Sequence, residues 1–171
     1  MELLEVIKSR RSIRAFRREG VPKDLIEEVL EAAIWAPSAG NLQPWIFFVI
    51  KDPKVKEGLC SAAYGQEWVL QAPMVIVACA NLEVTGSVYG ERGRKLYAIQ
   101  DVAMACQNLM LRATDLGLGT CFIGAFDEEA VSKILGLPKE VRPLGLIPLG
   151  KPAESPRAPP RKPLNLVTVW G

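Results

Sequence analysis

The sequence predicts a single domain of the α+β or mixed α/β class with four or five strands. Its 171 residues are enough for one hydrophobic core, and 49% are hydrophobic and 23% charged, as is typical of globular proteins. Short, wholly apolar runs alternate with longer segments in which apolar residues recur at helical spacing. No internal repeat and no linker divides residues 1–171 into two domains.

The first half of the chain contains three predicted helices and two predicted strands. Helices are expected over residues 2–8, 22–36 and 52–63, and a proline early in the second suits a first helical turn. The runs WIFFVI (Trp45–Ile50) and MVIVACA (Met74–Ala80) are continuously apolar. Such runs are typical of strands that are buried on both faces.

The second half begins with a segment, residues 84–93, that we expect to be a loop because it is polar and rich in glycine. A long helical pattern over residues 94–116 follows, apolar on more than one face, which predicts burial in the core or at a subunit interface. A third strand (120–126), an acidic-capped helix (127–138) and a fourth strand (142–150) complete the pattern.

The C-terminal residues, about 151–171, differ in composition from the rest of the chain. KPAESPRAPPRKPLN is proline-rich and lacks an apolar period, which predicts an extended arm. The closing LVTVW is apolar enough for a strand. We therefore expect this arm to pair with another subunit.

Histidine is absent from the sequence. This excludes Ser-His-Asp and Cys-His catalysis and nearly all catalytic zinc sites. The four cysteines are widely spaced and form no CxxC pair, so we expect buried, reduced thiols and no metal site. If the protein is an enzyme, a cofactor is expected to carry the chemistry.

The net charge of +2 gives no general argument for a nucleic-acid or membrane partner, and we expect neither. The early acidic residues and the lack of an apolar signal-peptide region favour a cytoplasmic location. Positive charge is nevertheless concentrated between Lys8 and Arg18, with a second cluster at residues 157–162.

The basic segment contains Arg10, Ser12 and Arg14 at alternate positions. In an extended chain alternate residues face the same side, so two guanidinium groups and a hydroxyl would converge, as a phosphate requires. A solvated basic face explains the same pattern, and RNA binding is a third interpretation.

The loop PSAGNLQPW (Pro37–Trp45) carries Ser38, Asn41 and Gln43 beside a predicted core strand. Side-chain amides can read a flat heterocycle edge that alternates donors and acceptors, such as the pyrimidine edge of a flavin. A serine-capped turn that leads into a core strand explains it equally well. In GLGTCFIGAF (117–126), Gly124 follows a strand and would allow close approach of a ligand to the backbone.

Taken in order, RRSIRAF, APSAGNLQPW, QAP, QDVAMACQNLMLRATDLGLGTCFIG and LIPLGKPAESPRAPPRKPL resemble the FMN-dependent nitroreductase family over nearly the whole chain. The resemblance implies an α+β fold with a central mixed sheet flanked by helices. It also implies an intimate homodimer with FMN at the interface and an exchanged C-terminal arm. The chain is short for this family, and we expect it to lack the helical lid of larger members between Asn81 and Arg94.

By the same resemblance, the cofactor-binding residues come from four parts of the chain. They are Arg10, Arg11, Ser12 and Arg14; Pro37, Ser38, Ala39, Asn41 and Gln43, from the other subunit; Ile123 and Gly124; and Arg161 and Lys162.

The implied activity is a ping-pong reaction in which NADH or NADPH gives hydride to flavin N5 and a nitroaromatic, quinone or similar small acceptor is then reduced. No residue is assigned as a catalytic acid or base. Two alternatives remain: specialised flavin chemistry on the same fold, such as reductive dehalogenation or flavin fragmentation, and an FMN-binding protein without turnover.

Overall fold

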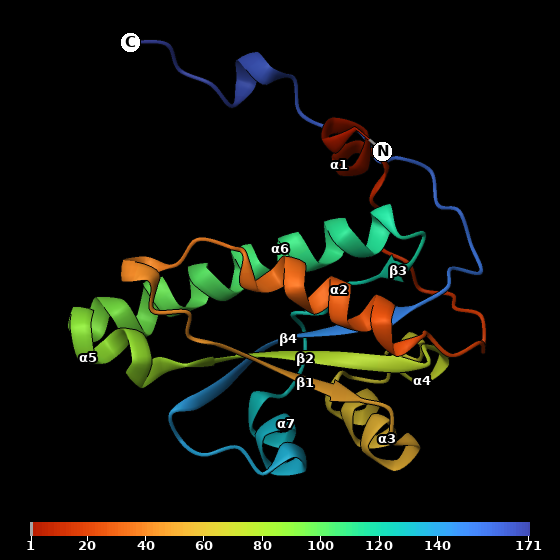
Figure 1. The fold of residues 1–171 in the computed structure, drawn as a ribbon, viewed down its shortest axis with the longest axis horizontal. Helices are drawn as coiled ribbons and strands as arrows, with labels where there is room; N and C mark the ends of the chain where they lie inside the picture. The colour runs from red at the N-terminus through yellow and green to blue at the C-terminus, as the bar shows by residue number, and fades with distance from the viewer. Residues whose placement is uncertain (1) are drawn as a thin grey trace.

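The computed structural model describes residues 2–171, which form a four-stranded sheet with helices on both faces (Figure 1). The strands β1 (Trp45–Ile50), β2 (Met74–Asn81), β3 (Gly119–Thr120) and β4 (Val141–Gly150) lie in the order β1-β2-β4-β3. All three ladders are antiparallel, whereas a mixed sheet was expected. Within the described residues, the parallel component is one isolated bridge between Ser12 and Thr120.

The two long apolar runs differ in burial because they occupy different places in the sheet. β2 is central and almost completely buried, as predicted. β1 is an edge strand that pairs only with β2, and most of its side chains are half-buried. The expectation that Trp45–Ile50 is buried on both faces holds in part: alternate side chains of β1 pack against both cores, but they stay half-buried because the strand lies at the edge of the sheet.

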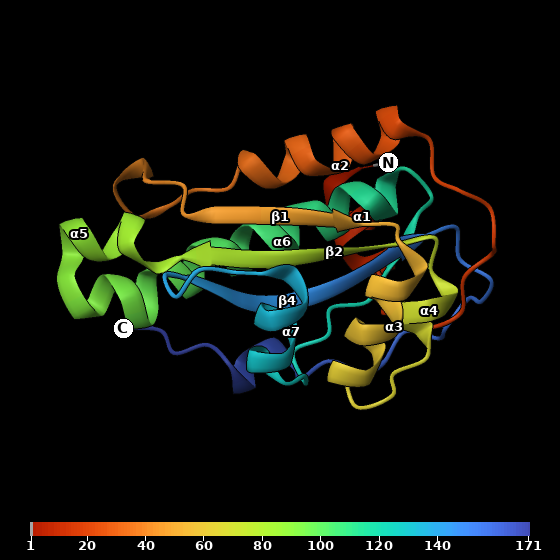
Figure 2. The ribbon, with the colours of Figure 1, turned by 90° about the horizontal axis from the view of Figure 1, so that it is seen from below.

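Alternate side chains of β2 divide the interior into two cores. Met74, Ile76 and Ala78 face α2 (Lys23–Ile34) and α6 (Ala98–Asp115). Val75, Val77 and Cys79 face the opposite layer. That layer contains α3 (Pro53–Ala62), α4 (Trp68–Gln71) and α7 (Glu128–Leu135), as Figures 1 and 2 show. The helix predictions for these segments are confirmed, with small shifts at the ends.

The segment expected to be a loop is mostly helical: α5 (Leu82–Arg92), which is kinked at Gly90 (φ +59°, ψ −145°), is followed by the π-helical turn η2 (Gly93–Tyr97). The Asn81 side chain caps α5 by accepting from the Glu83 N–H (3.1 Å). The glycines allow close packing: a Cβ on Gly93 would lie 2.5 Å from the Thr85 carbonyl oxygen. Gly93 therefore serves close packing between helices, whereas Gly90 interrupts the helix, as the sequence analysis expected of glycine in this segment.

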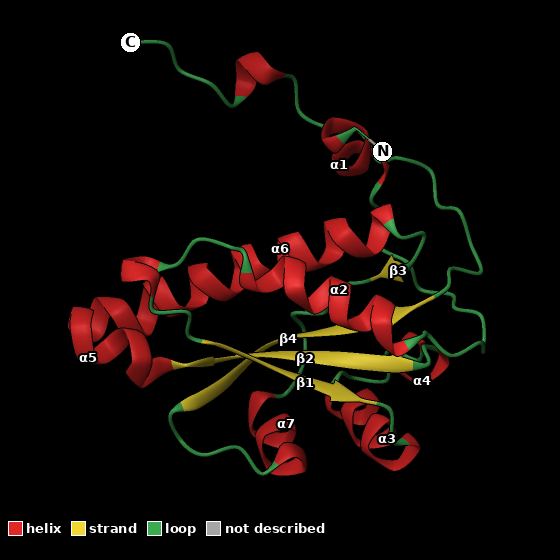
Figure 3. Ribbon diagram, viewed as in Figure 1, coloured by secondary structure: helices red, strands yellow, loops and turns green. Residues whose placement is uncertain are grey.

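The two termini lie on the same side of the molecule. α1 (Leu3–Ser9) lies against α6. After β4 the chain is irregular except for the short turn η3 (Leu164–Leu166), as Figure 3 shows. The expected strand over LVTVW is absent from the described chain, and Val169 and Trp170 are 96% and 86% exposed. The expected third strand is also shorter, since only Gly119–Thr120 joins the sheet continuously.

No helix within residues 2–171 combines the length and the apolarity needed to cross a membrane.

Candidate functional site

A cavity of about 250 Å³ lies between the basic N-terminal segment and the C-terminal arm. The N-terminal segment contributes Arg10, Arg11, Ser12 and Arg14, so four predicted site residues do converge. The arm contributes Arg161, also predicted, together with Pro156, Arg157 and Pro159. Lys162 is exposed and does not line this cavity. We call this cavity, lined by Arg10, Arg11, Arg14, Arg157 and Arg161, the arginine cavity.

Backbone hydrogen bonds hold the basic segment in the extended form that the alternation of residues predicts. The Ile13 N–H donates to the Thr120 carbonyl (2.9 Å), which docks the segment on the end of β3. Ile13 is buried against Gly119, where a Cβ would come within 2.9 Å of it. Because neighbours in an extended chain face opposite sides, Ser12 and Arg14 face away from the core.

The C-terminal arm fastens to the other side of the same segment. The Arg17 N–H donates to the Lys151 carbonyl (2.9 Å), and the Ala153 N–H donates to the Ala15 carbonyl (2.8 Å). Glu154 accepts hydrogen bonds from the backbone N–H groups of Arg14 and Ala15. The start of the arm is thus part of the site in one chain.

The arginine cavity has a large excess of positive charge. Five arginines line it and no carboxylate does. Within residues 2–171 none of these five guanidinium groups forms an ion pair. The Arg11 Nε is buried and has no hydrogen-bond partner in the described chain. Buried, unpaired donors of this kind favour an anion with several oxygen atoms, such as a phosphate.

Arg14 and Trp68 form the wall of the site toward α4. The guanidinium carbon of Arg14 lies 5.5 Å from the centre of the Trp68 ring, within range of a cation–π interaction. The Trp68 Nε1 is buried, and no described residue accepts its hydrogen. Sequence analysis did not single out Trp68, because its partner Arg14 lies more than fifty positions earlier in the chain.

Cysteine chemistry does not account for this site. All four cysteines are buried free thiols, as predicted. Burial raises the pKa of the Cys121 thiol, and the nearby Arg14 lowers it by less. Burial also raises the pKa values of Cys79 and Cys106 to about 12. Thiols with raised pKa values are protonated at neutral pH and are poor nucleophiles.

The polar loop Pro37–Trp45 is a tight turn whose backbone is strained. Gly40, Asn41 and Gln43 have φ values of +58°, +56° and +53°, a region that non-glycine residues rarely adopt. Ser38 Oγ accepts from the Gln43 N–H (3.0 Å), as expected of a serine-capped turn. The Gln43 amide donates to the Asn41 carbonyl (3.1 Å). Asn41 is exposed, and Ala39 is half-buried.

Two residues that sequence analysis missed hold this loop in place. Asp101 on α6 accepts from the Ala39 N–H (3.1 Å), and its side chain is only 3% exposed. Burial raises the pKa of this carboxyl group, and its Oδ2 has no partner in the described chain. Tyr89 on α5 covers Gly40, where a Cβ would lie 2.7 Å from the tyrosine oxygen. One acidic residue in the apolar run AIQDVAMAC was the available signal for Asp101.

The loop and the arginine cavity lie at opposite ends of the sheet. Figures 1 and 2 show the loop beside α5 and the basic segment at the far end, near α4. One chain therefore does not bring the predicted residues of the loop and of the basic segment together. Ile123 is buried and bonded to Leu146, while Gly124 is exposed. A Cβ on Gly124 would meet only Phe122, at an ordinary 3.6 Å, so packing within one chain does not require glycine there.

Comparison with known proteins identifies the relatives of this architecture. The sequence model of the nitroreductase family matches residues 7–66 and 58–151. A protein named NADH dehydrogenase from Thermus thermophilus is 38% identical, with 94% of this chain and 92% of the relative covered. A Bacillus subtilis protein named FMN reductase [NAD(P)H] is 31% identical, with 95% and 72% covered. The structure of NADPH:FMN oxidoreductase from Vibrio harveyi complexed with NAD+ superposes with a TM-score of 0.91 at 26% identity, with 98% and 76% covered.

Proposed function

The chain belongs to the nitroreductase family of NAD(P)H-dependent oxidoreductases, and we propose that it binds FMN and uses it to reduce a small acceptor such as a nitroaromatic compound or a quinone. Bound FMN would supply the redox chemistry, accepting a hydride from NADH or NADPH at N5 and passing two electrons to the acceptor in a ping-pong sequence. The arginine cavity is the observation that carries this proposal, because its five arginines, with no carboxylate in the lining, suit a phosphate-bearing cofactor.

The residues of the arginine cavity fit the phosphate and ribityl parts of FMN. Arg10, Arg14 and Arg161 can neutralise the phosphate, and the Ser12 hydroxyl can donate to it. Three buried polar atoms in or beside the site lack partners in the described chain: Arg11 Nε, Trp68 Nε1 and Thr120 Oγ1. A ribityl chain and a flavin edge carry the oxygen and nitrogen atoms that such groups need.

We propose that a second copy of the chain supplies the rest of the site. Its loop would bring Pro37, Ser38, Ala39, Asn41 and Gln43 to the flavin, while Ile123 and Gly124 of the first copy would lie along the ring. Large apolar side chains are exposed on the face formed by α1 and the end of α2, including Leu3 (68%) and Trp35 (78%). Large apolar side chains that are exposed together on one face support a homodimer. The arm, with Val169 and Trp170 exposed, would wrap the partner.

In this arrangement the side chains bind and orient, and no residue acts as a proton donor or acceptor. Arg14, stacked on Trp68, is placed to stabilise negative charge at the edge of the reduced cofactor. The rigid loop would exclude water from one face and would set the position of the acceptor. The absence of histidine does not conflict with this chemistry, because the cofactor and water can move the protons.

Visible spectroscopy of the purified protein tests the proposal. We expect flavin absorption near about 450 nm that bleaches when NADH or NADPH is added without oxygen and returns when a quinone is added. Bands that persist with both nucleotides would indicate an FMN-binding protein without this activity. A protein that stays colourless after incubation with FMN would contradict the proposal.

A further inference from the structure

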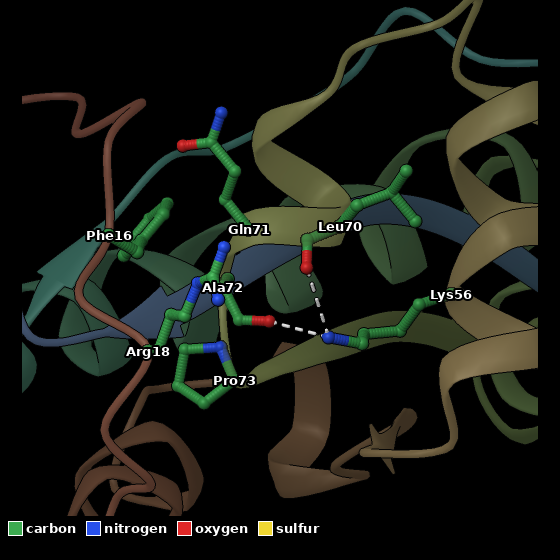
Figure 4. A pocket seen from close by; sticks show the side chains of 7 residues that line it. All are labelled: Phe16, Arg18, Lys56, Leu70, Gln71, Ala72 and Pro73. Atoms are coloured by element: carbon green, nitrogen blue, oxygen red, sulfur yellow. Dashed lines mark hydrogen bonds between the residues drawn. The ribbon is translucent and has the colours of Figure 1, made fainter.

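A second cavity, of about 650 Å³, lies outside the arginine cavity and shares no lining residue with it. Its walls come from three separate elements: the segment with Phe16 and Arg18, the helix α3 with Lys56, and the junction of α4 with β2 at residues 70–73 (Figure 4). The volume is within the range of small-molecule sites. We call it the Lys56 cavity.

Lys56 is the buried charge of this cavity. Its side chain is only 8% exposed, and its ammonium group donates to the carbonyl oxygens of Ala72 (2.6 Å) and Leu70 (3.3 Å), as Figure 4 shows. Burial lowers the pKa of this lysine. No carboxylate lines the cavity, and Lys56 forms no ion pair within residues 2–171. A buried cation that is held only by carbonyl dipoles is usually compensated by an anion.

Arg18 brings a second positive charge to the same cavity. Figure 4 shows its side chain beside Ala72 and Pro73, which lie between it and Lys56, so the two basic side chains enter the cavity from opposite sides. Arg18 forms no ion pair with any residue of the described chain. Two cations from different elements therefore face one space without a counter-charge, and a bound anion there would interact with both.

The remaining lining is apolar and firmly held. Phe16 is bridged to Pro152, and Phe16 and Pro73 close over Gly150, where a Cβ would lie 2.5 Å from Pro73 and 3.2 Å from Phe16. Leu70 completes the apolar part, and the Gln71 amide stands at the rim. The exposed lining is mostly polar, and Phe16 and Leu70 add an apolar contact, so the walls suit a small organic anion.

We propose that the Lys56 cavity binds a small organic carboxylate, with the carboxylate between Lys56 and Arg18 and its apolar part against Phe16 and Leu70. This site is separate from the proposed flavin site. Occupancy would stabilise the junction of α4 with β2, which also carries Trp68 toward the arginine cavity.

Titration of the isotopically labelled full-length protein with benzoate tests this proposal by backbone amide NMR. We expect saturable shifts at Arg18, Gln71 and Ala72. Benzyl alcohol, which has the ring but not the charge, should bind at least about tenfold more weakly.

Three variants make the test specific. Lys56→Met keeps the length of the buried side chain and should abolish the shifts. Arg18→Gln alters only an exposed side chain, so it should fold normally and weaken benzoate about fivefold or more. Arg10→Ala, a change in the arginine cavity, should leave benzoate binding intact even if flavin is lost. The proposal is overturned if benzoate produces no saturable shifts, if benzyl alcohol binds equally well, or if Arg18→Gln binds benzoate as the wild type does.

Discussion

The two ends of the sheet carry different halves of the predicted cofactor site, and they are built in opposite ways. At one end the arginine cavity is assembled from segments more than 140 residues apart in the chain, Arg10–Arg14 and Pro156–Arg161, and its arginines form no ion pair in the described chain. At the other end the polar loop is a local turn, held by Asp101 and Tyr89, and the exposed side chains of Asn41 and Gln43 bond to each other within the loop. The arginine cavity is suited to an anionic ligand, and the exposed loop is suited to contact with another protein surface. The difference supports the proposal that one chain holds two half-sites.

Deletion of residues 151–171 should have the largest effect, because it removes parts of one half-site and of the proposed dimer contact together. The deletion removes Arg157 and Arg161 from the cavity and the hydrogen bonds that fasten the basic segment. We expect loss of flavin and a shift from dimer to monomer, measured by absorbance and analytical ultracentrifugation. A truncated protein that stays a yellow dimer would show that the arm contributes neither to flavin binding nor to the dimer contact.

Arg10→Ala distinguishes a role in binding FMN from a role in stabilising the fold. Loss of charged hydrogen bonds to a phosphate should weaken FMN binding about 100-fold, while the melting temperature of the flavin-free protein should change little. Fluorescence titration with FMN measures the first, and thermal unfolding the second. Arg17→Ala is the matched control, since Arg17 is exposed in the same segment but does not line the cavity. An Arg10→Ala protein that keeps all its flavin through dialysis would contradict the assignment.

Asp101→Leu tests the half-site at the other end. It leaves the Ala39 N–H without an acceptor, and we expect the free energy of unfolding to fall by about 1–3 kcal/mol. FMN binding should weaken as well, if the loop reaches the flavin. Asp101→Asn keeps an acceptor for this N–H and is the control. Equal stability of the two variants would show that the Asp101–Ala39 hydrogen bond does not contribute to the free energy of unfolding.

The same position predicts a pH dependence. Burial raises the pKa of Asp101 above the value of 3.8 in the unfolded chain, so the folded state binds the proton more tightly. The contribution of this group to stability is therefore greatest below pH 3.8 and is lost as the pH rises toward the raised pKa. Asp101→Asn cannot ionise, so its advantage over the wild type should grow with pH in that window. Urea unfolding of both proteins between pH 3 and 7 measures their difference in free energy of unfolding. A difference that stays constant with pH would contradict the raised pKa of Asp101.

Substitutions at the neighbouring residues Arg161 and Lys162 should give the smallest effects on FMN affinity. Comparing Arg161→Ala with Lys162→Ala shows where the arginine cavity ends along the arm. Arg161 lines the cavity and Lys162 does not. We expect FMN affinity to fall about tenfold for Arg161→Ala and less than about twofold for Lys162→Ala. A larger loss for Lys162→Ala would mean that the arm is arranged differently when the cofactor is bound.

The sequence was most informative where local pattern decides the structure. The continuous apolar runs predicted β1 and β2, and helical spacing predicted α2, α3, α6 and α7. It was misleading over much of residues 84–93, because Gly86 and Gly93 serve close packing against Arg94 and Thr85, whereas Gly90 does interrupt the helix. The burial of β1 was overestimated for the single chain and the strand over LVTVW was mispredicted, since an apolar run does not reveal what covers it.

For the site, alternation in the basic segment was enough to predict the convergence of Arg10, Ser12 and Arg14. The contributions of Arg157, Trp68 and Asp101 depend on contacts between residues far apart in the chain, which no local pattern encodes. The order of the motifs, rather than any one of them, indicated the family. The positions of the loop and the cavity at opposite ends could not be read from the sequence, because they depend on the path of the chain through the sheet.

A mixed dimer tests the two half-sites most directly. One chain would carry Arg10→Ala and the other Ser38→Ala with Asn41→Ala, each with a different affinity tag, so that the heterodimer can be isolated. If each flavin takes arginines from one chain and the loop from the other, one site has both defects and the other has none. We predict that the heterodimer retains one tightly bound FMN, while both parent homodimers lose theirs. A heterodimer as empty as its parents would show that each site lies within a single chain and would contradict the account.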